Sequence, residues 1–569
     1  MAKLEKLGKI IETEVLVIGG GSSGLWAANR ARELGSDVLI VDKGPKDWGG
    51  QASSAGGDFD AVLPEENLDD FVKDIVYYYD GLCEQDLIEE LFRQSFSRLK
   101  DYQMLGCQFL TKPDGKLKGI PQRGLDHVTL YPARIRGKGG TDMIKGLVNE
   151  MNRLGVKRLD RTLVTDLLKQ NGRVIGAVGF DTRNGEFYIF KASAVVLAAG
   201  EGGWKASYHS NTTTGEGIYM AFKAGAELRN FEFVRVWNVP KLFAWEGQTS
   251  LLPLGARFVN GKGEPFMDKY SPVLGENTDP HYNVIGMAFE AREGRGPIYF
   301  DITPLKPEDR ELMKPQTGWQ LLNYQKLLKL GIDFFKDKTE WMPQLTSSFG
   351  GLTADIEGRT IVPGLFVASR ARSIDPGVYI GGFALSTTAT MGYLAGRIAA
   401  EYAKSHESFQ IDEDEVMELK SQLFAPLGKA GVSPKEVLRK IQEAVFPYDV
   451  CILKNEKSLK DALDKVEHLK NEVLPQMTAA DAHYLMKLIE VQAIAFTTEL
   501  YLRASLMRTE SRAGHYREDY PDHDDKNWLK WIVISQKDGK LNLRTEPVPF
   551  DRYKFKPARY YMDNFKFPR

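Results

Sequence analysis

One segment near the N-terminus constrains the fold more than any other. A short apolar run at 14–18 leads into glycines at 19, 21 and 24, which fit the spacing G-x-G-x-x-G. A helical pattern covers 25–34, and a second apolar run at 38–41 ends in Asp42. This order of strand, glycine turn, helix, strand and acid predicts a βαβ unit that binds a dinucleotide. The pyrophosphate is expected at the helix N-terminus and a ribose at Asp42.

Further small-residue segments predict which dinucleotide is bound. One cluster spans 49–57, a strand reaches a glycine turn at 197–200, and a late strand at 360–368 precedes a helix that begins after 381–382. Backbone with small side chains can pass close to a flat ring system, and a second helix N-terminus can face the polar end of that ring. We therefore expect FAD rather than a nicotinamide cofactor.

Charge and composition exclude several classes of protein. The 569 residues carry 75 Lys and Arg against 77 Asp and Glu, a net charge of −2, so the basic excess of a nucleic-acid-binding protein is missing. Neither an apolar run long enough to span a membrane nor a secretory signal is found. Cys83, Cys107 and Cys451 are too far apart for a metal knot or an iron–sulfur run. We expect a cytoplasmic protein with reduced thiols, no metal site and no direct membrane insertion.

Several segments in order resemble the flavoprotein subunits of the fumarate reductase/succinate dehydrogenase superfamily. They are the glycine motif, the threonine–glycine stretch at 210–217 with its helix, the segment 232–234, and the segment 508–521 with 528–530 after it. The resemblance implies an α/β protein with a Rossmann-like FAD-binding domain at 1–230 and 346–405. It also implies an inserted α+β capping domain at 231–345. Helical spacing at 410–535 predicts a helical bundle domain.

The family pattern and the glycine segments together predict the residues that hold FAD. Arginines in the segment 508–517 are expected to join the helical domain to the FAD-binding domain by ion pairs. The last residues, 546–569, are rich in aromatic and basic side chains and form either an ordered arm on this or a partner subunit or a solvated tail. The expected FAD contacts are Gly19, Gly21, Ser22, Ser23, Gly24, Asp42, Lys43, Gly49, Gly50, Gln51, Ser54, Gly56, Gly57, Ala199, Gly200, Thr214, Gly382, Leu385, Ser386 and Thr387.

The sequence departs from the family where its members attach flavin and bind a dicarboxylate. The segment 46–50, which leads into the small-residue cluster, contains no histidine. The resemblance therefore implies non-covalent FAD. The stretch 277–283 lacks the catalytic arginine of the family's Arg-Asp motif, and 347–351 and 378–382 lack its substrate histidine and second arginine. A dianion needs charged partners at both ends, so fumarate or succinate chemistry is an alternative rather than the leading expectation.

One branch of the superfamily, the alpha subunit of adenylylsulfate reductase, also lacks the Arg-Asp motif. The pair Tyr282-Asn283 and the segment 293–298 are similar to that branch. The resemblance implies a flavoprotein that forms a sulfite adduct at flavin N5 beside a ferredoxin-like iron–sulfur subunit.

Candidate catalytic residues come from segments expected to line the cleft between the FAD-binding and capping domains. Arg257 either holds an anion or forms a surface salt bridge. His281 stands where the family has its catalytic arginine, and is either a proton donor or a capping group. Tyr282 either acts in catalysis or satisfies a buried hydrogen bond. Tyr379, just before the late glycines, is expected to approach the flavin ring.

The sequence does not decide between a functional and a structural role for two pairs of arginines. Arg370 and Arg372 either bind substrate or a flavin phosphate, or pair with Asp375. Arg134 and Arg136 resemble a loop near the active-site entrance of relatives.

The leading hypothesis is an FAD-dependent oxidoreductase that exchanges hydride or electrons with a small anionic substrate. Because the chain has no cluster motif of its own, an external carrier such as an iron–sulfur subunit is expected, and an oligomer is compatible with this. The alternatives are an adenylylsulfate reductase alpha-type subunit, a fumarate reductase or succinate dehydrogenase flavoprotein, and a non-catalytic electron-transfer subunit.

Overall fold

The computed structural model describes residues 4–45, 49–135, 138–207, 210–242, 248–315, 317–406 and 410–568. Its largest sheet has the strand order β6-β2-β1-β9-β8-β7, and β16 also pairs with β9. At its centre β1 (Lys9–Ile18) runs parallel to β2 (Val38–Val41) and β9 (Phe187–Leu197). The other strands are β6 (Lys157–Leu159), β7 (Thr162–Gln170), β8 (Arg173–Asp181) and β16 (Leu365–Val367). The apolar runs predicted as strands are therefore the buried centre of an α/β domain.

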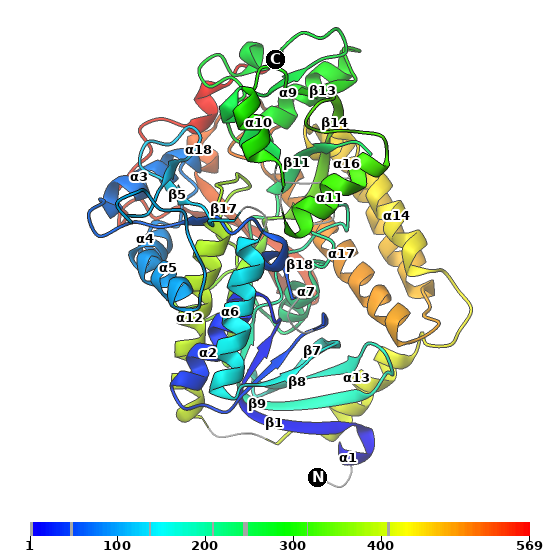
Figure 1. Ribbon diagram of the computed structural model, residues 1–569. Helices are drawn as coiled ribbons and strands as arrows, with labels where there is room; N and C mark the ends of the chain where they lie inside the picture. The colour runs from blue at the N-terminus through cyan, green and yellow to red at the C-terminus, as the bar shows by residue number, and fades with distance from the viewer. Residues whose placement is uncertain are drawn as a thin grey trace.

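Two helices pack against each other on this sheet (Figure 1). α2 (Ser22–Glu33) follows β1, and α12 (Phe383–Lys404) follows the late strand. A Cβ at Gly392 would lie 2.3 Å from the Ser23 carbonyl oxygen, and one at Gly396 would lie 2.2 Å from that of Ala27. These contacts advance in the same direction along both helices. The two glycine-led N-termini therefore lie at the same end of the sheet.

The remaining elements of the first part of the chain surround this layer. α6 (Gly139–Leu154) packs on α2, and a small antiparallel sheet has the order β3-β5-β4. The shorter elements are α1 (Leu4–Leu7), β3 (Phe59–Asp60), α3 (Leu68–Tyr78), α4 (Gln85–Arg93), α5 (Ser95–Met104), β4 (Ile120–Pro121), β5 (Thr129–Tyr131) and α7 (Glu216–Lys223).

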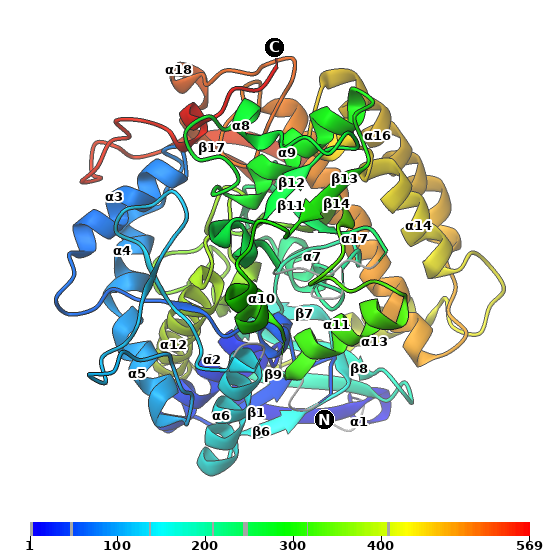
Figure 2. The same ribbon diagram turned by 45° about the horizontal axis from the view of Figure 1, so that its top comes forward.

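A second, antiparallel sheet with the order β11-β14-β13-β12 forms the core of the inserted region. Figure 2 shows it beside the helices of the same region, above the large sheet. The sequence Thr-Asp-Pro at 278–280 starts α9 with an Asp279 cap and a proline in the first turn. Its elements are β11 (Val234–Pro240), β12 (Arg257–Val259), α8 (Met267–Tyr270), α9 (Pro280–Arg292), β13 (Ile298–Asp301), α10 (Pro307–Met313), α11 (Gly318–Lys329) and β14 (Thr339–Ser348).

The C-terminal region combines helices with a hairpin that the sequence prediction missed. In Figure 1 α14, α16 and α17 lie along one side of the molecule, and α18 lies on the other side near α3. The helices of this region are α13 (Glu413–Phe424), α14 (Pro434–Val445), α15 (Tyr448–Cys451), α16 (Glu456–His468), α17 (Ala482–Met507) and α18 (Asp525–Trp528). β17 (Lys530–Lys537) and β18 (Lys540–Pro547) follow, so the expected helical region ends in a strand. The β-branched run at 532–534 is the sequence signal for it.

The C-terminal hairpin is joined to both crossings between the two main regions. β17 pairs with β10 (Leu228–Arg229), which in turn pairs with β15 (Gly351–Leu352). The chain leaves the FAD-binding region just after β10 and returns at β15. The two connecting segments therefore pair directly with each other, and the hairpin extends this sheet beside β10.

The last residues form an ordered arm, which we define as 548–568. On one side Gln85 and Phe555 exchange two hydrogen bonds, of 2.6 and 3.1 Å. On the other side Phe565 stacks on Tyr282 of α9 with ring centroids 3.9 Å apart. The arm thus joins the FAD-binding region to the capping region. Within the described ranges, no helix is both long and apolar enough to cross a membrane.

Candidate functional site

The first glycine turn has the close approaches that a dinucleotide cradle needs. A Cβ on Gly24 would lie 1.8 Å from the Gly19 carbonyl oxygen, so this position cannot carry a side chain without moving the turn. At Gly21 the nearest protein atom to an added Cβ is the Cα of Gly50, 3.7 Å away. Gly21 thus faces open space at the α2 N-terminus, as backbone next to a pyrophosphate should.

Beside this turn Asp42 has protein partners, whereas Arg158 and Ser23 have buried polar atoms without one, which fits a bound nucleotide. Asp42 is buried and accepts hydrogen bonds from the backbone N–H groups of Gly20 and Gly44. Arg158 is bonded through Nε to Asp160, but its buried Nη1 and Nη2 have no hydrogen-bond partner. Ser23 Oγ is also buried without one. Unpaired buried donors are costly, so these groups fit an adenosine diphosphate moiety.

The side chains of Lys43 and Thr214 interact with each other and with other protein groups. Lys43 Nζ donates to Thr214 Oγ1 at 2.9 Å and to Glu490 of α17 at 2.9 Å, and it also pairs with Glu216. These two carboxylates raise the pKa of Lys43 despite burial. Both residues were predicted to contact FAD. In the structure Lys43 joins α17 to the FAD-binding region, and its contact with FAD stays a prediction.

The predicted flavin end is also assembled from separate segments. Gly50 adopts a left-handed φ of 70° next to Gly21, and Gln51–Ser54 forms a 3₁₀ turn. Gly382 (φ 86°) lies so close to Asp60 that a Cβ would be 2.8 Å from its Oδ1. The start of α12 therefore meets residues 59–60, which follow the small-residue cluster 49–57 closely in the chain.

Several hydroxyls predicted to bind FAD have protein partners instead. Ser386 Oγ donates to the Asp60 carbonyl, and Thr387 Oγ1 to the Phe383 carbonyl at 2.8 Å. Ser54 Oγ donates to the Gln51 carbonyl, and Ser22 Oγ lies 3.0 Å from the Tyr102 hydroxyl. We therefore expect backbone N–H groups rather than these hydroxyls to face the cofactor.

Other predicted positions supply backbone or small side chains to the same surface. Gly49 packs on the Gly20 carbonyl, and Gly57 packs on Gly139 at the start of α6. Gly200 (φ 82°) donates its N–H to Ser369 Oγ at 3.3 Å. Gly56 faces the Asp58 carboxylate, Ala199 packs against Gly19 and Gly217, and Leu385 is buried on α12.

A buried charge cluster lies where the two regions meet. Glu201 accepts from Arg235 at 3.0 Å and from Gln51 at 3.3 Å, and it pairs with Arg370 at 3.4 Å. Arg370 also pairs with Asp375. The two arginines hold the pKa of the Glu201 carboxyl below its usual value although burial acts in the opposite sense. The predicted pairing of Arg370 with Asp375 is thus present, within a larger compensated cluster.

The ring of Phe349 joins the two arginines of this cluster. The guanidinium of Arg235 lies 4.9 Å from the Phe349 ring centroid, and that of Arg370 lies 5.0 Å from it. Phe349 lies in the stretch that meets the family's substrate histidine. Its ring can stabilise cations by contact with the π-face but cannot transfer a proton.

His281 forms a dyad with the cap residue of its own helix. Its Nδ1 lies 2.6 Å from Asp279 Oδ1, which also accepts the His281 backbone N–H at 2.7 Å. Asp279 Oδ2 accepts from the Tyr78 hydroxyl at 2.7 Å and from the Tyr379 N–H at 2.5 Å. These interactions lower the pKa of the Asp279 carboxyl against the effect of burial. An ionised Asp279 orients the ring with Nδ1–H toward itself.

The other side of His281 is turned toward aromatic residues. Its Nε2 is buried and has no hydrogen-bond partner. The ring lies 6.4 Å from Trp237 and 5.9 Å from Phe349, and Trp237 packs edge-on at 4.6 Å from Tyr379. Trp237 Nε1 and Arg235 Nε are likewise buried without a partner. His281, Tyr379 and the charge cluster therefore belong to one contiguous site.

Two predicted catalytic residues are not part of this site. Arg257 is exposed on β12, the strand of the capping sheet farthest from β11. Tyr282 is fully buried in the aromatic stack of the C-terminal arm, and its hydroxyl has no partner. Sequence proximity to His281 was misleading, because adjacent helix positions point in different directions.

The remaining predicted arginines have other surroundings. Arg372 is buried and donates to the Ala354 carbonyl at 3.0 Å and to Glu84 at 3.4 Å. Arg134 is exposed near Gln108, and Arg136 lies outside the described residues.

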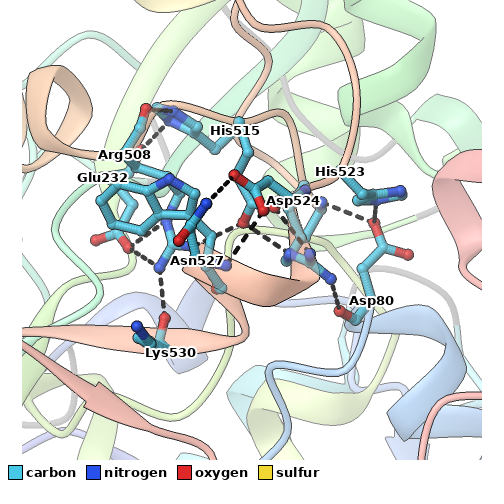
Figure 3. A network of polar contacts seen from close by, with 12 residues as sticks. Asp80, Glu232, Arg508, His515, His523, Asp524, Asn527 and Lys530 are labelled. Carbon is cyan, nitrogen blue, oxygen red and sulfur yellow. Dashed lines mark hydrogen bonds and ion pairs between the residues drawn. The ribbon is translucent and has the colours of Figure 1, made fainter.

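Ion pairs of the 508–517 segment join the helical region to the rest of the molecule (Figure 3). Arg508 is fully buried between Glu232 at 2.8 Å and Glu510 at 2.8 Å. Arg512 donates to the Asp80 carbonyl at 2.7 Å, and Asp80 accepts from the Ala513 N–H at 2.8 Å. Since Glu232 lies between β10 and β11, the predicted structural role of this segment is present at the crossing itself.

Sequence reasoning missed Arg158, Glu201, Arg235, Trp237 and Asp279. A signal existed for two of them, because Arg235 and Trp237 interrupt an apolar strand at alternate positions and so share one face. Glu201 depends on partners far along the chain, and Arg158 on the nearness of its guanidinium to Gly20, so neither left a local pattern.

A nucleotide cradle, a small-residue surface for a ring system and a histidine dyad above it define a flavin-dependent oxidoreductase. Comparison with known proteins agrees. The chain matches the family described as "FAD binding domain" over residues 14–368 and "Fumarate reductase flavoprotein C-term" over 439–561. The protein belongs to this family of FAD-binding flavoproteins, and it is an FAD-dependent oxidoreductase.

Relatives of similar length cover nearly the whole chain. It is 28% identical over 557 residues to a CoM/CoB fumarate reductase polypeptide of Methanothermobacter marburgensis, covering 93% of this chain and 98% of the relative. It is 27% identical to a fumarate reductase flavoprotein subunit of Mycobacterium tuberculosis, with 95% and 97% coverage.

Solved structures share the fold. A quinol fumarate reductase chain of Escherichia coli superposes with a TM-score of 0.87 at 22% identity, covering 97% of this chain and 99% of that one. Adenylylsulfate reductase of Archaeoglobus fulgidus gives 0.81 at 23% identity, with 96% and 98% coverage.

Proposed function

We propose that the protein reduces or oxidises a small anionic substrate in the cleft between the FAD-binding and capping regions, with His281 as the proton-transferring residue. The observation that carries this proposal is the dyad. Asp279 fixes Nδ1 of His281, and the buried Nε2 has no protein partner. A buried ring nitrogen without a protein partner can give a proton to a bound substrate atom or take one from it.

FAD, when bound, supplies the hydride or electron chemistry. The protein groups supply position and a proton. Reduction of a double bond adds a hydride to one atom and a proton to the other, and His281 Nε2–H would give that proton. The negative charge of Asp279 stabilises the imidazolium form before transfer and holds the ring in place afterwards. Trp237, Phe349 and Tyr379 exclude water around the proton.

We further propose that FAD is held without a covalent bond and that electrons pass to or from an external carrier, such as an iron–sulfur subunit. The segment before the small-residue cluster has no histidine for attachment. The three cysteines are buried singly in the described structure. Acid precipitation should therefore release all of the flavin into the supernatant.

A fumarate-type reaction is the second candidate, favoured by the names of the relatives. Against it, Arg235 and Arg370 are already neutralised by Glu201 and Asp375. Such a cluster offers little net positive charge to a dianion.

The test is photoreduction of the purified holoprotein followed by anaerobic addition of fumarate, adenylylsulfate and several enoates, together with a separate addition of sulfite to the oxidised holoprotein. We expect at least one enoate to reoxidise the flavin. Reoxidation by fumarate alone would favour the second candidate, and bleaching of the oxidised flavin by sulfite would favour adenylylsulfate-type chemistry. A completely negative panel would overturn the proposal of substrate turnover and leave an electron-transfer subunit.

A further inference from the structure

The turn at 121–124, between β4 and β5, touches both halves of the proposed site. Gln122 Nε2 donates to Asp60 Oδ1 at 3.0 Å and to the carbonyl of Gly381, which precedes the flavin-side helix α12. On the other side of the turn, a Cβ on Gly124 would lie 2.8 Å from the ring of Tyr561. Arg123 is therefore held between the flavin end of the cleft and the C-terminal arm.

Tyr561 connects this turn to the dyad. Its hydroxyl lies 2.9 Å from Thr278 Oγ1 and accepts the Asp279 N–H at 3.3 Å. Its ring also packs against Tyr78, whose hydroxyl donates to Asp279. Residues on both sides of Arg123 thus contact groups that position either the flavin or His281.

Arg123 differs from the other arginines of the site because its charge is not compensated. Its buried Nη1 has no hydrogen-bond partner, and no ion pair of its guanidinium occurs within the described part of the chain. Arg235 and Arg370, by contrast, are both paired with Glu201. A guanidinium N–H buried without an acceptor costs free energy unless a ligand supplies one.

The electrostatic effect of Arg123 reaches the hydroxyls around the dyad. Burial raises the pKa values of Tyr78, Tyr379 and Tyr561, and the positive charge of Arg123 opposes that rise at all three. These tyrosines come from α3, from the segment before α12 and from the arm. The half-buried Arg123 is thus a cation whose charge acts on all three hydroxyls.

We propose that Arg123 binds the anionic group of the substrate and so determines its charge class. This rests on the proposed function and deepens it. One uncompensated guanidinium matches one anionic group, which it can hold by two parallel hydrogen bonds. The aromatic surfaces of Trp237 and Tyr379 suit a flat, unsaturated remainder. The substrate class is therefore a small unsaturated monoanion rather than a dicarboxylate.

The test compares binding of crotonate, crotonamide and fumarate to the oxidised holoprotein, followed by the change in flavin absorbance. Crotonamide has nearly the shape of crotonate without its charge. The wild type should bind crotonate at least tenfold more tightly than crotonamide or fumarate. Arg123→Gln should weaken crotonate binding about 10- to 100-fold and leave crotonamide binding unchanged. Arg123→Lys should give an intermediate loss.

Arg134→Gln is the matched control, because Arg134 is an exposed arginine in the connection after β5; it should behave as the wild type. Flavin content and melting temperature report whether each variant is folded. Equal crotonate affinity in Arg123→Gln and wild type would overturn the proposal, as would a wild type that does not prefer crotonate or responds to none of the probes. Since binding is measured without turnover, failure of the proposed reaction would appear separately, as a reduced flavin that no oxidant reoxidises.

Discussion

Asp279 is the residue on which the geometry of the proposed proton donor depends. Its two oxygens accept from His281, Tyr78 and the Tyr379 backbone. We predict that Asp279→Asn lowers kcat about 10²- to 10⁴-fold, because the amide no longer stabilises the imidazolium or fixes its tautomer. The pH dependence of kcat should change with it, while the flavin content should not.

Tyr282→Phe is the matched control for this prediction. Tyr282 follows His281 on α9, and its buried hydroxyl has no hydrogen-bond partner. Removal of this hydroxyl should leave kcat within about twofold of the wild type. A large loss of kcat in Tyr282→Phe, or none in Asp279→Asn, would contradict the assignment of the dyad.

Lys454 is expected to make stability depend on pH. Burial lowers its pKa from the usual 10.5 to about 7, and Nζ donates to His515 Nδ1 at 3.0 Å. Between these values the unfolded chain binds a proton that the folded chain does not, so stability rises with pH, by at most about 1.4 kcal/mol per pH unit. The melting temperature of the wild type relative to Lys454→Met should increase from pH 7 to pH 9. A difference in melting temperature between the two proteins that stays constant from pH 7 to pH 9 would contradict this prediction.

At the scale of single residues, sequence can predict a role where a local pattern carries the chemistry, and it cannot where the partners are distant. The first glycine motif and Asp42 could be proposed as FAD contacts because their spacing is itself the geometric requirement. The ion pair of Lys43 with Glu490 could not be predicted, because the two residues lie 447 positions apart. Arg123 has no distinguishing neighbour in sequence, and its role depends on how the arm and α12 enclose it.

At the α2 N-terminus, Gly21 leaves space for the cofactor, whereas Gly24 is a glycine because the fold itself leaves no room for a side chain. Gly21 has φ −74° and ψ −175°, which alanine can adopt, and its added Cβ meets no protein atom closer than 3.7 Å. We predict that Gly21→Ala folds normally without FAD but binds it at least tenfold more weakly, since the methyl group would occupy the pyrophosphate position. Titration of apoprotein with FAD measures this.

Gly24→Ala should behave differently, because its Cβ meets the Gly19 carbonyl at 1.8 Å. It should lower the melting temperature of the apoprotein itself. Unchanged FAD affinity in Gly21→Ala would contradict the placement of the cofactor at this turn.

The C-terminal arm is expected to stabilise the capping region. Phe565→Ala removes the ring that stacks on Tyr282 and should cost about 3–5 kcal/mol, as for other buried aromatic truncations. It should also make the capping region more sensitive to limited proteolysis, measured with melting temperature on the full chain. Phe550→Ala, a partly buried position near the start of the arm, should have a smaller effect. Equal effects of Phe565→Ala and Phe550→Ala would contradict a specific stabilising role of the Phe565–Tyr282 stack.

At the scale of the whole molecule, the chain closes the connection between its two main regions with its own C-terminus. The hairpin strand β17 pairs with β10 at one crossing, where Arg508 is also buried against Glu232, and β10 pairs with β15 at the other. The sequence order of segments predicted the FAD-binding, capping and helical regions. It did not reveal the hairpin, because the pairing of β17 with β10 joins residues far apart in sequence.

The most direct test of the account is anaerobic stopped-flow reoxidation of the photoreduced holoprotein by the oxidant that it accepts, in the wild type and in His281→Gln. Both proteins should retain their flavin. The account predicts rapid reoxidation of the wild type and a rate at least 100-fold lower in His281→Gln, because the variant lacks the proton donor. Equal rates in the two proteins would contradict it.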